Sequence, residues 1–303
     1  MNFIQKIKYS QNWNIGFCEQ TPEELIKDKA LKPIQWMKHP YKDRWFADPF
    51  ILKVTKDEIV VFVEECNMEK PKGILCELVL DRDSLWLKQR FVLLEAETHL
   101  SYPQIIRQND KVYVCPENGA SGKLNIYEYD AVNHRLFAPV CILEENLGDA
   151  TIVKKGDEYF LLATKYPALF EDALLYHSTS LMGPFTLFAD SPAQCDKSCA
   201  RPGGAFFYSD GQLYRPAQDC VKRYGSALSI MKIESIGVPM VEDKDFTIIA
   251  KSYKYNLGIH TINFHNRLCV VDGYGYYYPI IGRLYHHAIS QFVINKIKQI
   301  ANI

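Results

Sequence analysis

Short apolar runs alternate with polar turns along the chain, and five segments repeat the same order of positions. Each begins with a small or polar cluster and continues through an apolar run, a polar turn and a second apolar run. The five segments are Phe46–Glu65, Ser101–Asn118, Gly148–Lys165, Ala200–Asp219 and Gly258–Tyr274. Their turns (KD, ND, GD, DG and HN) and their Val, Ile, Phe and Tyr content are typical of β-hairpins.

The spacing of these hairpins predicts the fold. They start near residues 46, 101, 148, 200 and 258, and further apolar pairs such as GILCELVLD with WLKQRFVLL follow them. Four strands in about 50 residues match one propeller blade. We therefore predict an all-β chain, a single five-bladed β-propeller domain over residues 1–303 with short terminal helices. A β-sandwich of the same hairpins is the alternative, but it does not explain a near-constant period.

Two segments outside the repeats have helical signals. In TPEELIKDKAL, Thr21 is a suitable N-cap and Pro22 suits the first helical position. The C-terminal tail, residues 284–303, has apolar residues from Ile289 to Ile300 at spacings of three and four and is predicted to be amphipathic. We expect this tail to pack on the flank of the propeller. The alternative is a peripheral membrane contact or an oligomer contact.

Composition and charge narrow the class of protein. A hydrophobic content of 48% with 23% charged residues excludes wholesale disorder. The formal net charge of −1 argues against nucleic acid as a partner. The 19 Tyr, 16 Phe and 4 Trp fit a β-rich protein, or a surface that stacks on ring-shaped ligands.

The cysteines and the N-terminus bear on the compartment. No apolar run reaches the roughly 18 residues of a transmembrane segment, and MNFIQKIKYSQNWN lacks the features of a secretory signal. Cys195 and Cys199 are close, but no second pair follows, so neither a disulfide framework nor structural zinc is expected. Other cysteines lie in apolar runs and are expected in the core: Cys66, Cys76, Cys115, Cys141 and Cys269. The expected location is the cytoplasm.

The candidate site follows from propeller geometry, because the starts and ends of the inner hairpins meet at one end of the central axis. The hairpin starts supply Asp48, Tyr102, Asp149, Arg201 and His260. The hairpin ends supply Glu64, Glu65, Glu117, Asn118, Lys165, Arg215, Gln218, Asp219 and Asp272. This set is rich in carboxylates and also holds cations, which indicates a site.

Several members have a structural alternative. Asp48 and Asp149 could cap their strands by bonding nearby amides. Glu64 and Glu65 point to opposite sides of a strand, and alternation favours Glu65 as the one that faces the axis.

Other residues of this set could also have a purely structural role. Glu117 could be a turn residue, and Arg215 could form an ion pair with Asp219. His260 is expected in the pocket rather than in the core. Tyr224 is either a packing residue or a platform for a sugar.

The chemistry that fits this set is acid–base catalysis at a glycosidic bond, in which one carboxylate stays ionised and another is protonated. Asp48 is predicted to be the base, and Asp149 or Glu117 the acid or a group that tunes a pKa. The other candidate residues are expected to bind substrate: Glu65, Tyr102, Lys165, Arg201, Arg215, Asp219, Tyr224, His260 and Asp272. A phosphate of an activated sugar would meet Lys165, Arg201, Arg215 and Arg223. No ligand spacing demands a metal, and no cofactor motif is present.

Six ordered motifs resemble a known family. WFADPF (45–50), HLSYP (99–103), GPF (183–185), ARPGG (200–204), LYR (213–215) and QDC (218–220) resemble the N-terminal domain of plant glucosamine inositolphosphorylceramide transferases. The resemblance implies a five-bladed propeller related to glycoside hydrolase families thirty-two, forty-three and sixty-eight. Those enzymes have an Asp at the start of the first blade, which corresponds to Asp48.

The chain departs from these relatives in two ways. Family forty-three enzymes have a Glu as general acid at the start of a later blade, whereas this chain has Tyr102 at its second start and Asp149 at its third. The complete hydrolase triad therefore does not transfer. The plant proteins carry an exostosin-like transferase domain after the propeller, and these 303 residues contain no such domain.

These observations lead to two functional hypotheses. The first, which we favour, is a cytoplasmic enzyme that forms or cleaves a glycosidic bond in surface-glycan or glycolipid synthesis, acting on a sugar, an activated sugar or a glycan. The second is a non-catalytic propeller that binds a sugar or a headgroup and partners a glycosyltransferase.

Overall fold

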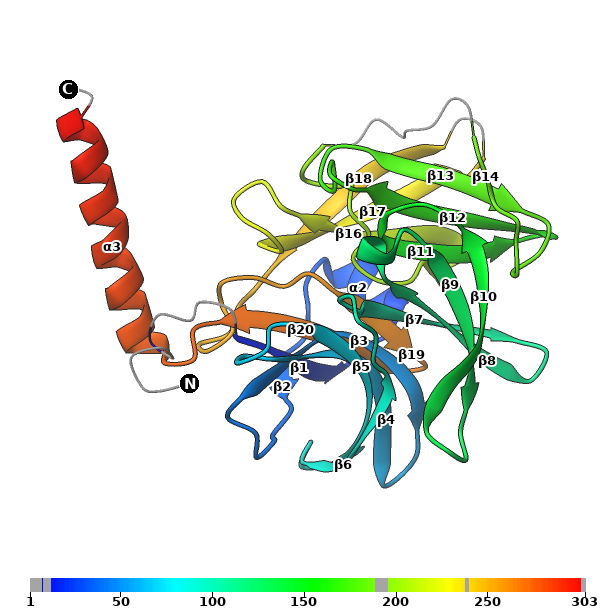
Figure 1. The fold of residues 1–303 in the computed structure, drawn as a ribbon, viewed down its shortest axis with the longest axis horizontal. Coiled ribbons are helices and arrows are strands. Elements are labelled where there is room, and N and C mark those ends of the chain that lie inside the picture. The colour runs from blue at the N-terminus through cyan, green and yellow to red at the C-terminus, as the bar shows by residue number, and fades with distance from the viewer. Residues whose placement is uncertain (1–6, 8–11, 189–195, 238–239, 301–303) are drawn as a thin grey trace.

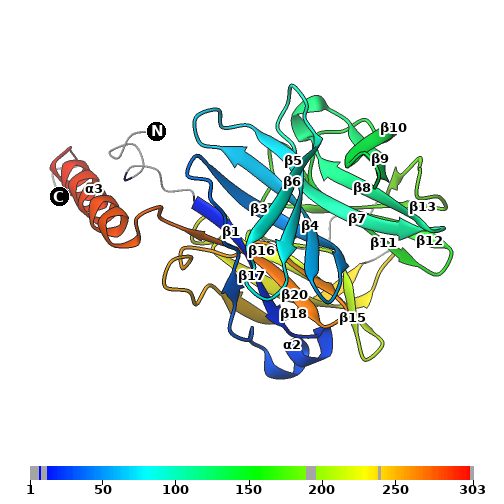
Figure 2. The ribbon, with the colours of Figure 1, turned by 90° about the horizontal axis from the view of Figure 1, so that it is seen from below.

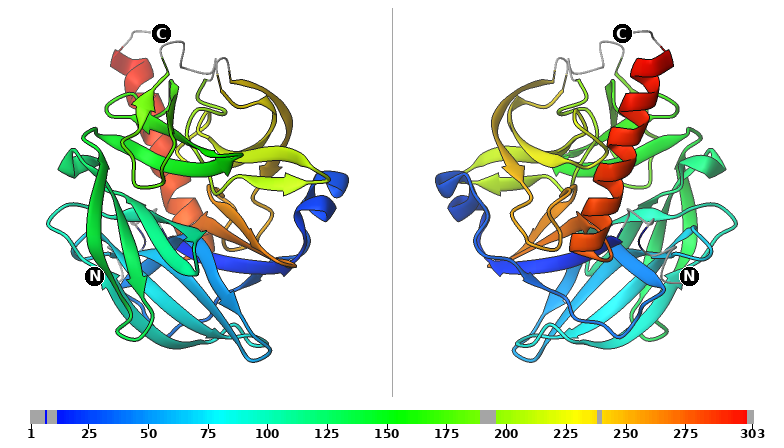
Figure 3. Two further views of the ribbon diagram at one scale, coloured as in Figure 1. Left: turned by 90° about the vertical axis from the view of Figure 1, so that its right-hand side faces the viewer. Right: turned by 90° about the vertical axis from the view of Figure 1, so that its left-hand side faces the viewer.

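Five small antiparallel sheets surround a common centre (Figures 1 and 3). The computed structural model describes residue 7 and residues 12–188, 196–237 and 240–300, with side chains described up to residue 289. Within these ranges each sheet has four strands and forms one blade. The prediction of an all-β, five-bladed propeller is confirmed.

The first four blades each come from consecutive strands. The first contains β3 (Arg44–Val54), β4 (Glu58–Asn67), β5 (Gly73–Asp81) and β6 (Leu87–Leu94). The second contains β7 (Ser101–Gln108), β8 (Lys111–Glu117), β9 (Leu124–Asp130) and β10 (Arg135–Leu143), with a 3₁₀ turn at Gly119–Ser121. The third contains β11 (Leu147–Lys155), β12 (Glu158–Lys165), β13 (Ala173–Ser178) and β14 (Thr186–Leu187). The fourth contains β15 (Phe207–Ser209), β16 (Gln212–Asp219), β17 (Ala227–Ser235) and β18 (Val241–Ile249).

The fifth blade joins the two ends of the propeller. Its order is β19 (Ile262–His265), β20 (Leu268–Gly275), β1 (Asn12–Glu19) and β2 (Gln35–Trp36). β1 pairs with β20 along its whole length, from Asn12 opposite Gly275 to Glu19 opposite Leu268. No strand was predicted for this N-terminal segment, although Trp13, Ile15 and Phe17 alternate with polar or small residues and are all buried.

Three inner strands begin with the same irregularity. The pairing register shifts between Ala47 and Phe50, between Ser101 and Gln104, and between Gly148 and Thr151. The first residues inside these bulges are Asp48, Tyr102 and Asp149, and their φ angles are 49°, 47° and 46°. A bulge bends the strand and redirects its side chains. The three blades therefore present equivalent residues at the axis.

The fourth and fifth hairpins begin later than predicted. Regular pairing starts at Phe207 and Ile262 rather than near residues 200 and 258, and only isolated bridges precede it. Gly204, with φ 142°, explains part of this difference, because a Cβ at that position would lie 2.0 Å from the Ile262 carbonyl oxygen. The two blades approach too closely there for a side chain.

Cores between neighbouring blades hold the ring together. Ile15, Phe46 and Val61 belong to one buried cluster that joins the fifth blade to the first. Four of the five cysteines that were expected in the core are buried: Cys66, Cys76, Cys115 and Cys269. Cys141 is exposed, so that prediction is wrong; it lies on β10, the outermost strand of the second blade.

The two helices differ in how well they were predicted. α2 (Pro22–Asp28) has the expected cap: the Glu24 N–H donates to Thr21 Oγ1 (3.2 Å), and the Thr21 N–H donates to Glu24 Oε2 (3.0 Å). α3 (Pro279–Ile300) projects away from the blades (Figures 1 and 2), so the expected packing on the flank is wrong. Ile280 and Leu284 are exposed on it. Within the described ranges, no helix is long and apolar enough to span a membrane.

Candidate functional site

A cavity of about 300 Å³ opens where all five blades meet, and we call it the axial pocket. Its wall consists of Trp13, Trp45, Ala47, Asp48, Glu64, Cys66, Pro71, His99, Ser101, Glu117, Tyr166, Arg201, Tyr224 and His260. Five of the predicted site residues therefore line one cavity: Asp48, Glu117, Arg201, Tyr224 and His260. The volume is at the lower end of the roughly 300–1,000 Å³ that is usual for ligand sites.

Asp48 is the carboxylate that the bulge of β3 directs to the axis. The Thr261 hydroxyl donates to its Oδ1 (2.7 Å), and the Tyr102 N–H donates to its Oδ2 (3.2 Å). Burial raises the pKa of Asp48 to about 7; His260 opposes this rise, and Asp149 and Glu64 add to it. The Asp48 carboxyl can therefore lose or gain a proton near neutral pH.

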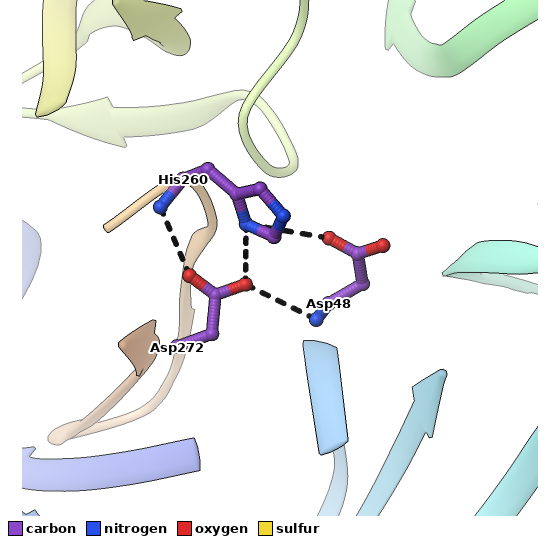
Figure 4. Close-up of side chains that lie close together, drawn as sticks. All are labelled: Asp48, His260 and Asp272. Carbon is purple, nitrogen blue, oxygen red and sulfur yellow. Dashed lines mark hydrogen bonds and ion pairs between the residues drawn. The ribbon is translucent and has the colours of Figure 1, made fainter. Parts of the chain in front are cut away.

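His260 and Asp272 support Asp48 from the fifth blade (Figure 4). His260 Nδ1 lies 2.6 Å from Asp272 Oδ2 and 3.7 Å from Asp48 Oδ1. Both oxygens of Asp272 accept backbone N–H bonds, from His260 (2.9 Å) and Thr261 (3.0 Å) at Oδ1 and from Asp48 (3.2 Å) at Oδ2. Burial opposes a charge on His260, but Asp272 and Asp48 outweigh it and raise the pKa of His260 to about 9.

The same three residues are the one group in the described ranges that could hold a metal. One ligand atom from each of Asp48, His260 and Asp272 lies within 4.8 Å of the others. However, His260 Nδ1 is directed at Asp272, and both Asp272 oxygens already accept hydrogen bonds. We interpret the group as a hydrogen-bonded support for Asp48 rather than as a metal centre.

Arg201 joins two more carboxylates. Its Nε donates to Asp149 Oδ2 (2.5 Å), and its Nη2 donates to Glu117 Oε2 (3.1 Å). Glu117 also accepts the Asp149 N–H (2.9 Å) and the Tyr166 hydroxyl (2.8 Å). Burial raises the pKa of Asp149 to about 7, with Arg201 opposing and Glu117 adding to the rise. Asp149 is buried behind Arg201 and is not part of the pocket wall.

Tyr102 lies inside the propeller rather than on the wall. Its hydroxyl bonds the Thr151 hydroxyl (2.8 Å) and accepts the Gly204 N–H (2.8 Å). Through these contacts it links the second, third and fourth blades. Its backbone N–H donates to the Asp48 carboxylate, so Tyr102 helps to position Asp48 without lining the pocket.

Besides Asp149, Tyr102 and Asp272, four more predicted site residues lie away from the pocket wall. Glu65 forms ion pairs with Arg44 (2.8 Å) and Arg90, so the choice of Glu65 over Glu64 is corrected, because Glu64 is the one on the wall. The other three have local partners: Lys165 pairs with Glu145, Arg215 with Glu242, and Asp219 accepts the Val221 N–H.

The proposed Arg215–Asp219 pair is also corrected. The Arg215 guanidinium is almost completely buried and donates to Glu242 Oε2 (2.6 Å) and to the Cys199 carbonyl oxygen (2.8 Å). A buried guanidinium needs such partners within its own blade.

Several wall residues were not among the predicted site residues: Trp13, Trp45, His99 and Tyr166. Trp13 stacks on His260 with ring centroids 4.0 Å apart and on Tyr274 at 4.9 Å. It comes from β1, which the repeat did not include. Alternating apolar residues around Trp13 were the available signal. Tyr166 directly follows the end of the third hairpin, and His99 lies just before the start of the second.

The arrangement defines a class of protein: a five-bladed propeller whose axial pocket combines several carboxylates with indole and phenol rings. Aromatic faces and carboxylates are the groups that hold sugar rings and their hydroxyls. A family model described as glucosamine inositolphosphorylceramide transferase 1, N-terminal, matches residues 31–262. The chain belongs to this family.

Two curated relatives illustrate the extent of the likeness. The chain is 34% identical over 199 residues to glucosamine inositolphosphorylceramide transferase 1 of Arabidopsis thaliana, covering 63% of this chain and 26% of that protein. It is 30% identical over 203 residues to the protein of the same name from Oryza sativa subsp. japonica, covering 65% and 27%. The chain therefore matches only 26–27% of the length of these relatives.

Solved structures confirm the fold. A thermostable family-43 glycoside hydrolase has a TM-score of 0.57 at 10% identity, covering 80% of this chain and 88% of that one. The alpha-L-arabinofuranosidase from Podospora anserina in complex with cellotriose has a TM-score of 0.55 at 10% identity, covering 72% and 76%. At this identity the likeness concerns the fold alone.

Proposed function

We propose that this protein is a carbohydrate-active enzyme that forms or cleaves a glycosidic bond, with one sugar ring in the axial pocket and Asp48 as a reacting carboxyl group. The observation that carries the proposal is Asp48 itself. It lies in a strained backbone conformation at the pocket wall, and its pKa is raised to about 7. Strain and a shifted pKa at one pocket residue are typical of catalytic groups.

The walls support a sugar as the ligand. Trp13, Trp45, Tyr166 and Tyr224 line the pocket and offer ring faces or polar tips. Glu64 and the other acids offer acceptors for hydroxyl groups. The solved relatives bear names of sugar-cleaving enzymes, and the family bears the name of a sugar transferase.

The cations of the predicted site do not favour phosphate as the pocket ligand. Arg201 forms ion pairs with both Asp149 and Glu117. Its guanidinium carbon also lies 5.7 Å from the ring centre of Phe170 and 5.5 Å from that of Tyr224. Lys165 and Arg215 pair elsewhere, and Arg223 is exposed outside the wall. We therefore propose that the pocket holds an uncharged ring, and that any phosphate of an activated sugar stays outside.

The test is Asp48→Asn. Aryl glycosides and nucleotide sugars would be screened by thermal shift, and turnover would be measured on those that bind. Turnover should fall by about 10²–10⁴-fold because a reacting carboxyl is lost, while binding is kept. Asp57→Asn, in the exposed turn of the same hairpin, is the matched control. Unchanged turnover in Asp48→Asn would contradict the proposal that Asp48 is a reacting group of an enzyme.

The second candidate is a non-catalytic sugar-binding propeller that partners a glycosyltransferase. One observation favours it: Asp149 is off the wall, and Glu117 is engaged by Arg201, Tyr166 and the Asp149 N–H. The same screen decides between the two. Ligands that shift the melting temperature but are never turned over by the wild-type chain would support the binding module.

We also propose that the protein works in the cytoplasm, in surface-glycan or glycolipid synthesis, with α3 as a peripheral membrane contact. Buried thiols support a reducing compartment, since six cysteines of the described ranges are free and buried: Cys18, Cys66, Cys76, Cys115, Cys220 and Cys269. Exposed Ile280 and Leu284 support the contact. Cell fractionation tests both points; recovery of the native protein outside the cell would contradict the first.

A further inference from the structure

A second pair of ionisable side chains lies on the wall of the axial pocket beside Asp48. Glu64, near the end of β4, is 5% exposed, and His99, in the loop before β7, lies next to it. His99 Nε2 is 3.0 Å from Glu64 Oε1. The repeat pattern places Glu64 at a hairpin end and the HLSYP motif begins with His99, but neither assigns a role to the pair.

The backbone determines which nitrogen of His99 carries the proton. The Gly73 N–H donates to His99 Nδ1 (2.9 Å), so Nδ1 is the acceptor and the proton resides on Nε2. Nε2 lies 3.0 Å from Glu64 Oε1, which accepts no hydrogen bond within the described ranges. The Leu100 N–H also bonds the Gly73 carbonyl oxygen (3.1 Å), which ties the loop containing His99 to β5.

Position 73 leaves room for this arrangement. A Cβ on Gly73 would lie 2.7 Å from Glu64 Oε1 and 2.4 Å from the Leu100 carbonyl oxygen. A side chain there would displace either the carboxylate or the loop. The close approach of β5, Glu64 and His99 therefore depends on glycine.

Glu64 is also the least engaged of the acids at this end of the propeller. Glu117 accepts three bonds and Glu65 pairs with two arginines, whereas the Glu64 carboxylate has one close contact of this kind in the described ranges, with His99 Nε2. Glu64 therefore retains lone pairs for a bound hydroxyl group.

We propose that Glu64 is the second reacting carboxylate of the axial pocket, that it acts as the base, and that His99 is its positioning residue. The inference rests on the proposed function. The acceptor, water or a sugar hydroxyl, gives its proton to Glu64 as its oxygen bonds to the anomeric carbon. Asp48 gives its proton to the leaving oxygen as the old bond breaks, so the two carboxyl groups exchange protonation states.

This assignment differs from the roles expected from the sequence. There Asp48 is the base, and Asp149 or Glu117 is the acid. Here Asp48 is the proton donor and its partner comes from the same blade, because β3 begins and its antiparallel partner β4 ends at the axis.

The first test is Glu64→Gln, with turnover measured on the substrate found in the screen above. We expect turnover to fall by at least about 10²-fold. Formate should restore part of the turnover of Glu64→Ala, because a small carboxylate can replace a lost base but cannot repair a structural defect. Glu77→Gln is the matched control, since Glu77 pairs with His134 at the same 3.0 Å but lies outside the pocket.

The second test separates positioning from folding at His99. In His99→Asn the amide oxygen can accept the Gly73 N–H but the contact with Glu64 is lost, whereas the longer amide of His99→Gln can reach Glu64. We expect His99→Asn to lower kcat by about tenfold or more with little change in KM, and His99→Gln to retain more of it. Equal effects of the two variants would overturn the positioning role, and His134→Asn is the control.

A third measurement needs no substrate. Long-range ¹H–¹⁵N spectra of the full chain with labelled histidine, assigned through His99→Asn, should show the proton of His99 on Nε2. A proton on Nδ1 would overturn the proposal. If Glu64→Gln retains turnover and Asp48→Asn loses it, the role of Glu64 is wrong but the proposed enzymatic function stands. If both variants retain turnover, the proposed enzymatic function is itself contradicted.

Discussion

Three residues at the axis share a left-handed backbone conformation that side chains rarely adopt. Asp48, Tyr102 and Asp149 have φ angles of 46–49°, each at the bulge that opens an inner strand. Such conformations cost about 1–3 kcal/mol each and persist where the surroundings hold them. The bonds of Tyr102 to Thr151 and Gly204 are part of that support. Three of the eleven non-glycine residues with positive φ in the described ranges therefore lie at the axial end of the propeller.

The pH dependence of turnover tests the role of Asp48. Burial raises its pKa to about 7, Asp149, Glu64 and Asp272 add to the rise, and His260 opposes it. As the proton donor, Asp48 must be protonated, so kcat/KM should fall as the pH rises through about 7. Glu64→Gln removes a nearby negative charge and should move the midpoint of any residual activity to lower pH. A rate that instead increases through pH 7 would make Asp48 the base and contradict the assignment.

At the scale of single residues, sequence position predicted part of the site. Asp48, Glu117, Arg201, Tyr224 and His260 do line the pocket. The position of a residue along a hairpin indicates which end of the blade it occupies. It does not indicate which side of the strand faces the axis, or which side chain on a neighbouring strand will bond to the residue. Glu65, held by two arginines from other positions, was therefore chosen wrongly over Glu64.

At the scale of elements, the N-terminal strand is decisive. β1 pairs with β20, supplies Trp13 to the pocket, and buries Ile15 in the cluster that joins the fifth blade to the first. The hairpin pattern could not indicate this role, because a strand that closes a ring has its partner at the other end of the chain. The position of α3 could not be predicted for a similar reason, because the apolar face of a helix does not indicate which surface the helix contacts.

Ile15→Ala should weaken the whole propeller. Ile15 is completely buried, and removing its outer carbons leaves a cavity beside the closing strand. We expect the free energy of unfolding to fall by about 2–5 kcal/mol, measured by urea denaturation. Val132→Ala, at a position that is 86% exposed, should change it by less than about 0.5 kcal/mol. Equal stability of the two variants would contradict a closing role for β1.

At the scale of the whole molecule, closure predicts cooperative unfolding. The four tryptophans, Trp13, Trp36, Trp45 and Trp86, lie in or beside the first and fifth blades, whereas strands of all five blades contribute to the far-UV circular dichroism. Because each blade buries its faces against its neighbours, the two signals should change at the same urea concentration. Separate transitions would show that the blades unfold independently and would contradict this prediction.

The sequence by itself determined the number of blades, the class of fold and the kind of residue at the axis. Hydrophobic period and turn chemistry act over a few residues, and the repeat multiplies that local signal five times. Tertiary structure alone decided that β1 completes the fifth blade, that Asp149 lies behind Arg201, and that Glu64 rather than Glu65 faces the pocket. These outcomes depend on partners from distant parts of the chain, and no local pattern encodes which charge or ring will be there.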